Sequence, residues 1–260
     1  MIKAVIFDMD GTLIDSERLG AAAWLQAADE LGLEFSQDVS RGFIGRTLPD
    51  VLATLADLYG SEEDGERLWR RHREIREEMA KTDLKLKAGA SECIDALAAT
   101  GYHIGLATSS RHTTAEGNLR RFGLFDKFET VTCGEDVEHG KPDPEMYLLA
   151  CERAGADPTE CAVVEDSRNG CVAGITAGCH VFAVPDLVPL PAEVVDGCEA
   201  VLETLFDLPA AISSLGQPRS GPADWAADVN RGREQGCVPC SRVERPAAGW
   251  LRAVIGDVNE

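Results

Sequence analysis

Positive charge is scarce in this chain of 260 residues. It holds 25 Lys and Arg residues against 45 Asp and Glu residues, so its formal net charge at pH 7 is −20. Proteins bind nucleic acids and anionic membrane surfaces through clustered basic residues. The charge balance therefore argues against both as partners. It also requires that an anionic substrate be met by a local cation or a metal ion.

Long apolar runs are missing too. No stretch approaches the ~18 consecutive apolar residues that a membrane helix needs. At the start of the chain, Lys3 is followed by only a short apolar run before Asp8, which is unlike a secretory signal. The nine cysteines are an odd number, and most sit singly in apolar segments, a pattern typical of reduced, buried thiols. We therefore expect a cytoplasmic protein.

Five short apolar segments, bounded by turn residues, are typical of buried strands. They are residues 3–7 (KAVIF), 103–107 (HIGLA), 129–133 (ETVTC), 161–165 (CAVVE) and 180–184 (HVFAV). Helical patterns separate the later segments, at residues 113–123, 144–155 and 169–178. This alternation predicts an α/β fold with a Rossmann-like parallel sheet covered on both faces. Ligands of such sheets bind beyond the carboxyl ends of the strands.

A helix-rich interval breaks the alternation after the first strand. Three amphipathic patterns occupy residues 18–32, 48–60 and 63–81, and three or four helices fit the interval best. We predict a helical cap domain at residues 16–85, inserted into a catalytic core made of residues 1–15 and 86–212. The dense charge between Glu62 and Lys81 is interpreted as a solvated helix face.

The end of the chain has a different texture. Residues 213–260 are rich in Gly, Pro and Arg without periodicity, which predicts a poorly ordered or loosely docked extension of unknown role. Within it, Cys237 and Cys240 have the spacing of a metal or redox motif. No second such pair accompanies them, so the motif is weak evidence for a function.

Polar residues gather where the predicted strands end. Several carboxylates in one place repel one another unless a divalent cation lies among them, and oxygen ligands suit Mg²⁺. With a nearby lysine, such an ion would make a positive pocket that fits a phosphate, and Gly11 would let backbone amides turn toward it. Each residue alone could be a helix cap or loop residue, but their shared position favours one site. The residues are Asp8 and Asp10 (DMDGT), Thr108, Ser109, Ser110 and Arg111 (TSSR), Lys141 (GKPDPE), and Glu165 and Asp166 (VVEDS).

Together, DMDGT, LATSS, GKPDPE and VVEDS resemble the four signatures of the haloacid dehalogenase superfamily of phosphotransferases. The resemblance covers roughly residues 1–210 and favours the branch of β-phosphoglucomutase-like proteins and sugar-phosphate phosphatases, in which a helical cap follows the first motif. It implies that Asp8 is the nucleophile and that Asp10 moves the proton. It also implies a Mg²⁺ ion held by Asp8, the backbone carbonyl of Asp10, Glu165 and Asp166.

The same resemblance implies the residues that bind the substrate. Thr108, with Ser109 beside it, and Lys141 would hold the phosphoryl oxygens. An acid at Asp10 indicates cleavage of a P–O bond, because a leaving oxygen must be protonated. Arg46 falls where the mutase has a cap arginine for a second phosphate, and Ser110 and Arg111 could also contact a distal phosphate.

Two branches of the family remain open at this point. The mutase carries a cap histidine where this chain has Gly20, which favours a Mg²⁺-dependent phosphatase acting on a small phosphate monoester, such as a sugar or polyol phosphate. The alternatives are a β-phosphoglucomutase-type mutase and a non-catalytic protein that binds a phosphorylated ligand. The expected partner is a small phosphorylated metabolite, and the expected assembly is a monomer or a weak homodimer.

Overall fold

The computed structural model describes residues 1–44, 46 and 48–215 and contains a parallel sheet of six strands in the order β3-β2-β1-β4-β5-β6. The α/β, Rossmann-like fold predicted from the sequence is confirmed. Five strands coincide with the predicted segments to within a residue, whereas the two-residue β6 was not predicted. The strands are β1 (Ala4–Phe7), β2 (His103–Thr108), β3 (Thr130–Cys133), β4 (Cys161–Glu165), β5 (His180–Ala183) and β6 (Ala200–Val201).

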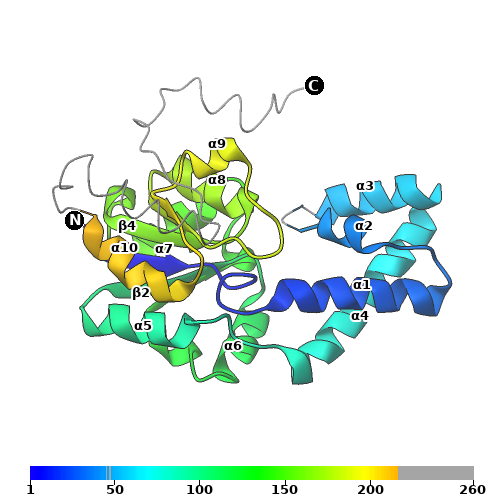
Figure 1. The fold of residues 1–260 in the computed structure, drawn as a ribbon, viewed down its shortest axis with the longest axis horizontal. Coiled ribbons are helices and arrows are strands. Elements are labelled where there is room, and N and C mark those ends of the chain that lie inside the picture. The colour runs from blue at the N-terminus through cyan, green and yellow to red at the C-terminus, as the bar shows by residue number, and fades with distance from the viewer. Residues whose placement is uncertain (45, 47, 216–260) are drawn as a thin grey trace, which may run out of the picture.

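Helices cover both faces of this sheet (Figure 1). Successive side chains of a strand point to opposite faces. In β1, Val5 and Phe7 therefore pack into a core cluster with α5, α6 and α10, while Ala4 and Ile6 pack into a second cluster with α7, α8 and α9. The helices are α5 (Ala90–Ala99), α6 (His112–Arg120), α7 (Glu145–Arg153), α8 (Arg168–Ala177), α9 (Ala192–Val195) and α10 (Leu208–Ser214). Short 3-10 helices lie at η1 (Phe125–Lys127), η2 (Gly134–Asp136), η3 (Pro158–Glu160) and η4 (Leu205–Asp207).

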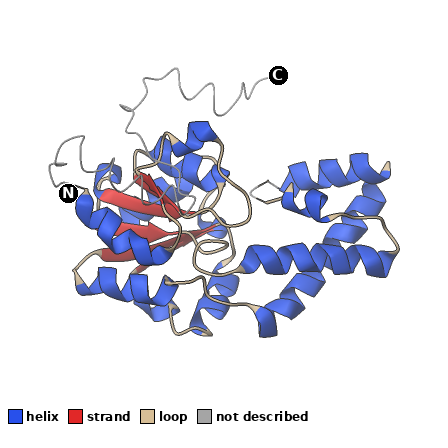
Figure 2. Cartoon of the chain, viewed as in Figure 1, coloured by secondary structure: helices blue, strands red, loops and turns tan. Residues whose placement is uncertain are grey.

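Four helices follow β1 and project to one side of the sheet (Figure 1), and all strands lie in the other part of the molecule (Figure 2). They are α1 (Ser16–Leu31), α2 (Gln37–Arg41), α3 (Leu48–Tyr59) and α4 (Glu62–Asp83). They enclose a third core cluster that includes Trp24, Leu55 and Leu68. We call α1–α4 the cap. The domain boundaries given above stay a prediction. The separate core cluster of the cap is compatible with them.

The two linkers between cap and sheet run side by side. The Asp15 amide donates to the Lys85 carbonyl at 2.9 Å, and the Lys87 amide donates to the Leu13 carbonyl at 2.9 Å. In the part of the chain that the structure describes, no helix combines the length and apolarity needed to cross a bilayer. Gly45, Thr47 and residues 216–260, with Cys237 and Cys240, lie outside the described residues.

Candidate active site

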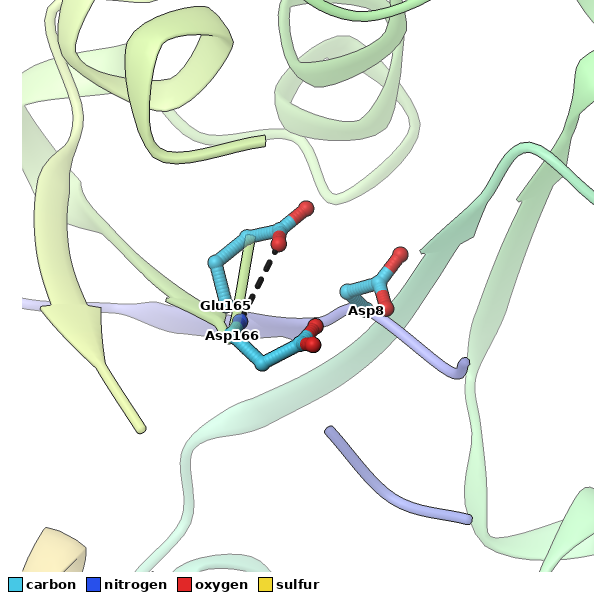
Figure 3. A group of neighbouring side chains, drawn as sticks. All are labelled: Asp8, Glu165 and Asp166. Atoms are coloured by element: carbon cyan, nitrogen blue, oxygen red, sulfur yellow. Dashed lines mark hydrogen bonds between the residues drawn. The ribbon is translucent and has the colours of Figure 1, made fainter. Parts of the chain in front are cut away.

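The register of the sheet places the first carboxylates together. Phe7 of β1 pairs with Val164 of β4, so the residues that follow, Asp8 and Glu165, lie at the same edge of the sheet. The Asp8 amide donates to the Val164 carbonyl at 2.9 Å. One carboxylate oxygen from each of Asp8, Glu165 and Asp166 lies within 4.8 Å of the other two. Figure 3 shows these side chains gathered beyond the ends of β1 and β4, with the Asp166 carboxylate directed toward Asp8.

Lys141 joins two of these carboxylates. Its Nζ atom donates to Asp8 Oδ1 at 2.6 Å, to Glu165 Oε1 at 2.7 Å and to the Ala107 carbonyl at 3.1 Å. Burial alone would lower the pKa of Lys141, but the two carboxylates more than offset it and raise that pKa above its usual value. Lys141 is therefore a fixed, buried positive charge beside Asp8.

Glu165 is held by more hydrogen bonds than any other acid of this cluster among the described residues. Besides Lys141, it accepts from the Tyr147 hydroxyl at 2.8 Å, from the Asp166 amide at 3.1 Å and from the Ser167 hydroxyl at 3.0 Å. Helix α8 packs directly against Glu165 at Gly170. A Cβ atom on this glycine would lie 1.7 Å from Glu165 Oε1. Glu165 thus acts as a rigid support that fixes the position of the Lys141 ammonium group.

Asp166 lies against the turn after β1. Gly11 has a φ of +87°, and a Cβ atom there would lie 2.2 Å from Asp166 Oδ2. The glycine is thus required both by its left-handed backbone and by the close approach of this carboxylate. The hydroxyl of Thr12 donates to Asp166 Oδ1 at 3.1 Å and holds the side chain in place.

Asp10 lies where the cap meets the sheet. Its Oδ2 atom accepts from the Ser110 hydroxyl at 2.8 Å, and its Oδ1 atom accepts from the Arg76 guanidinium at 3.3 Å. Ser110, which was predicted to contact a distal phosphate, is therefore engaged with Asp10. Arg76 was missed, because it lies within the charged segment interpreted as a solvated face. Most arginines of α4 do pair on the surface, and Arg76 is the exception that reaches the sheet.

A cavity of about 450 Å³ unites these groups. Thr108 is buried, and its hydroxyl oxygen accepts from the Ser110 amide at 3.1 Å. Arg46 reaches the cavity from the cap side and donates to the Thr54 hydroxyl at 3.1 Å. Arg111 does not line it, and instead forms the exposed N-cap position of α6. The predicted site residues that line the cavity are Asp8, Asp10, Arg46, Thr108, Ser109, Ser110, Lys141, Glu165 and Asp166.

The charges of the cluster fit a divalent cation. Burial raises the pKa of Asp8 to about 8, an effect that Lys141 partly opposes, and burial and then the charge of Glu165 raise the pKa of Asp166 well above its usual value. Three carboxylates against one lysine leave two uncompensated negative charges when all are ionised. Hard oxygen donors with this surplus suit a small divalent metal ion.

Known proteins are similar to this chain. Residues 5–184 match the family model described as haloacid dehalogenase-like hydrolase. A phosphorylated carbohydrates phosphatase of Thermotoga maritima is 33% identical over 177 residues, which are 68% of this chain and 82% of that protein. A beta-phosphoglucomutase of Bacillus subtilis is 31% identical over 190 residues, which are 70% of this chain and 82% of that protein.

A solved structure agrees with the sequence comparisons. A HAD family hydrolase from Deinococcus radiodurans, solved with bound phosphate and sodium, is 29% identical and superimposes with a TM-score of 0.68, covering 85% of this chain and 99% of its own. The family model spans the first strand, the cap and the strands that carry Thr108 and Glu165. The resemblance noted from the four motifs is confirmed, and the chain belongs to the haloacid dehalogenase-like hydrolases.

Proposed function

We propose that this protein is a Mg²⁺-dependent phosphatase that hydrolyses a small phosphate monoester of a sugar or polyol. The observation that supports it best is the arrangement around Asp8. One carboxylate oxygen contacts a buried lysine at 2.6 Å, a second acid, Asp166, lies beside it, and Asp10 faces the same cavity. Asp8 would be the nucleophile, Lys141 the phosphate-binding cation and Asp10 the proton carrier.

The reaction would proceed in two displacements. Asp8 attacks phosphorus, the P–O bond to the alcohol breaks, and the Asp10 carboxyl gives its proton to the leaving oxygen. Asp10 then takes a proton from water, whose oxygen attacks the aspartyl phosphate and releases inorganic phosphate and the free Asp8 carboxylate. Ser110 and Arg76 orient the two oxygens of Asp10. Lys141, together with the hydroxyl of Thr108, would bind the phosphoryl oxygens.

The metal ion would be held by Asp8, Asp166 and the backbone carbonyl of Asp10, with Glu165 beside them. When bound, it would supply positive charge that screens the carboxylates from the phosphate and polarises the phosphoryl group. The three buried carboxylates support this assignment, because their mutual repulsion needs a counter-charge beyond that of Lys141.

The relatives support hydrolysis of carbohydrate phosphates but include a mutase. A mutase transfers the phosphoryl group to a second phosphorylated sugar, so it must bind two phosphates. Here Gly20 offers no side chain where the mutase has its cap histidine. This difference supports transfer to water over transfer to a sugar phosphate.

The test is hydrolysis of 4-nitrophenyl phosphate with Mg²⁺, followed by a panel of sugar and polyol phosphates. Asp8→Asn should abolish turnover, because the amide is not a nucleophile, whereas Asp126→Asn, an exposed acid paired with Arg120, should retain it. Turnover that survives in Asp8→Asn would overturn the covalent mechanism. Conversion of β-glucose 1-phosphate to glucose 6-phosphate with a trace of bisphosphate, without net phosphate release, would establish the mutase instead.

A further inference from the structure

The residues that follow β3 contact the loop that carries Ser110. We call residues 133–136, which include η2, the β3 turn. Ser110 lies between β2 and α6, and its hydroxyl donates to Asp10 Oδ2 at 2.8 Å. The Gly134 amide donates to the Ser110 carbonyl at 3.0 Å, and a Cβ atom on Gly134 would overlap the Ser109 carbonyl oxygen. The two backbones therefore approach as closely as a glycine permits, and the β3 turn helps to set the position of Ser110.

The β3 turn also caps α6. Arg111 occupies the N-cap position of this helix, but its side chain makes no capping hydrogen bond to a described residue, and the first turn of α6 holds no acid. The first amides of a helix need acceptors from outside it, and the helix dipole favours an anion there. Glu135 meets this need, because its Oε2 atom accepts from the His112 amide at 3.1 Å. The start of α6 thus depends on a side chain of the β3 turn.

Asp136 adds a second link to α6. Both of its carboxylate oxygens lie 3.0 Å from His112 Nε2, which donates to them. Asp136 is itself held by β3 and α7, since it accepts from the Cys133 amide and from the Arg153 guanidinium, each at 2.8 Å. The hydrogen bond from Arg153 is the largest of the effects that lower the pKa of Asp136 below its usual value. Asp136 is therefore an ionised, fixed group to which the first side chain of α6 is bound.

The position of Ser110 matters because its hydroxyl orients Asp10. The Ser110 amide donates to the Thr108 hydroxyl at 3.1 Å, so its backbone is bound both to β2 and to the β3 turn. A general acid must lie within hydrogen-bond reach of the oxygen that it protonates. A shift of ~1 Å in this loop would misplace the Asp10 carboxyl group, and a misplacement of this size can lower the rate of an enzyme by about a hundredfold.

We propose that Asp136 is a positioning residue for the proton transfer by Asp10. Through His112 it fixes the start of α6 and thereby Ser110, whose hydroxyl orients the Asp10 carboxyl group. The proposal rests on the phosphatase function proposed above, which makes Asp10 the proton donor. It adds a residue that does not line the cavity around Asp8 and on which the proton transfer depends.

Two aryl esters that differ in their need for a proton provide the test. Phenyl phosphate releases phenol, which has a pKa of ~10 like that of tyrosine, and its departure is helped by an acid. 4-Nitrophenyl phosphate has the same ring but releases a stable anion that needs little such help. Asp136→Asn keeps the size of the side chain and removes its charge. It should lower kcat/KM about tenfold for phenyl phosphate and by less than about threefold for 4-nitrophenyl phosphate.

Two further variants show whether the effect passes through Ser110. Ser110→Ala removes the hydroxyl that contacts Asp10, so it should cause the same selective loss with phenyl phosphate. Combined with Ser110→Ala, Asp136→Asn should cause little further loss, because both changes act on one hydrogen bond. Glu116→Gln is the matched control: it removes an acid of α6 that pairs with Arg120 at 2.8 Å, and it should leave kcat/KM unchanged for both esters.

Calorimetry establishes which variants are folded at the assay temperature. If Asp136→Asn is not, His112→Ala takes its place, since it breaks the same link and leaves Asp136 with Arg153 and the Cys133 amide. Equal losses for the two esters would indicate a merely structural role and overturn the proposal. Unchanged rates, or additive effects of Asp136→Asn and Ser110→Ala, would overturn it as well. If the wild-type protein hydrolyses neither ester, the phosphatase function fails, and the positioning role fails with it.

Discussion

Glu17 is an acidic residue buried between the cap and the sheet, and its surroundings change its pKa. It lies in the first turn of α1, near the charges of Arg76 and Asp10. It lines the cavity that contains Asp8 and Asp10 and also a neighbouring cavity among the cap helices. Burial raises the pKa of Glu17 to about 7, and the favourable charge of Arg76 offsets only part of that effect. A carboxyl group in such surroundings is more easily protonated in the folded protein than in the unfolded chain.

The sign of the resulting pH dependence follows from this difference. Below the unfolded pKa near 4.5, both states are protonated, and Glu17 leaves stability unaffected. As pH rises toward 7, the unfolded chain ionises first, so the folded state loses stability across this window. Glu17→Gln should therefore stabilise the protein by about 1–2 kcal/mol at neutral pH and above, and by little at about pH 4.

Unfolding in urea as a function of pH measures this effect. Glu152→Gln, which removes an exposed glutamate of α7, is the control and should change stability by less than about 0.5 kcal/mol at every pH. A stability gain in Glu17→Gln that does not vary between acid and neutral pH would contradict the assignment, because it would arise from packing and not from ionisation.

At the scale of elements, the sequence predicts the sheet well and the cap contacts poorly. The strands were recognisable because a parallel strand buried on both faces is a continuous apolar run, as in residues 4–7, which are fully buried. Their order along the chain then brings Asp8, Thr108 and Glu165 to one edge. Arg76 carries no such signal, because it is one of many charged residues of α4, whereas His72 lies at helical spacing from Leu68 and Ile75 on the apolar face. Which side chains of α4 face Asp10 or Trp24 depends on how the cap helices pack.

Two helical glycines give opposite predictions for one substitution. In α8, Gly170 leaves no room for a Cβ atom beside Glu165, whereas in α6, Gly117 has nothing within 4 Å of that position. Gly170→Ala should displace Glu165, loosen Lys141 and lower kcat/KM by about a hundredfold or more. Gly117→Ala should stabilise the protein by about 0.5–1 kcal/mol, because alanine favours the helix.

Steady-state kinetics and urea unfolding of the two variants provide the comparison. Because a Cβ atom at Gly170 would overlap Glu165, Gly170→Ala should destabilise the protein, whereas Gly117→Ala should stabilise it. If Gly170→Ala behaved like Gly117→Ala, the close contact between α8 and Glu165 would be wrong, and with it the role of Glu165 as the support of Lys141.

For the molecule as a whole, the dominant feature is negative charge. The repulsion between carboxylates is strongest where they are buried. The net charge is −20, and three acids converge at the sheet edge with one lysine among them. Binding of a cation to the folded state stabilises it by an amount that grows with concentration, about 2.7 kcal/mol at a hundredfold excess over Kd. For a chain of this length that corresponds to a rise in Tm of about 5–10 °C.

Mg²⁺ should therefore raise the Tm, and a chelator should return it to the metal-free value. Asp166→Asn removes one buried carboxylate, so this variant should be more stable than the wild-type protein without Mg²⁺ and should gain little when Mg²⁺ is added. The wild-type protein should thus have the lower Tm without Mg²⁺ and the larger rise in Tm with Mg²⁺. This pattern distinguishes a specific site from general screening of surface charge.

Calorimetry with NaCl at the same ionic strength is the control. An equal rise of Tm with NaCl, or an undiminished response of Asp166→Asn to Mg²⁺, would show that the ion acts on the charged surface and not at the cluster formed by Asp8, Glu165 and Asp166.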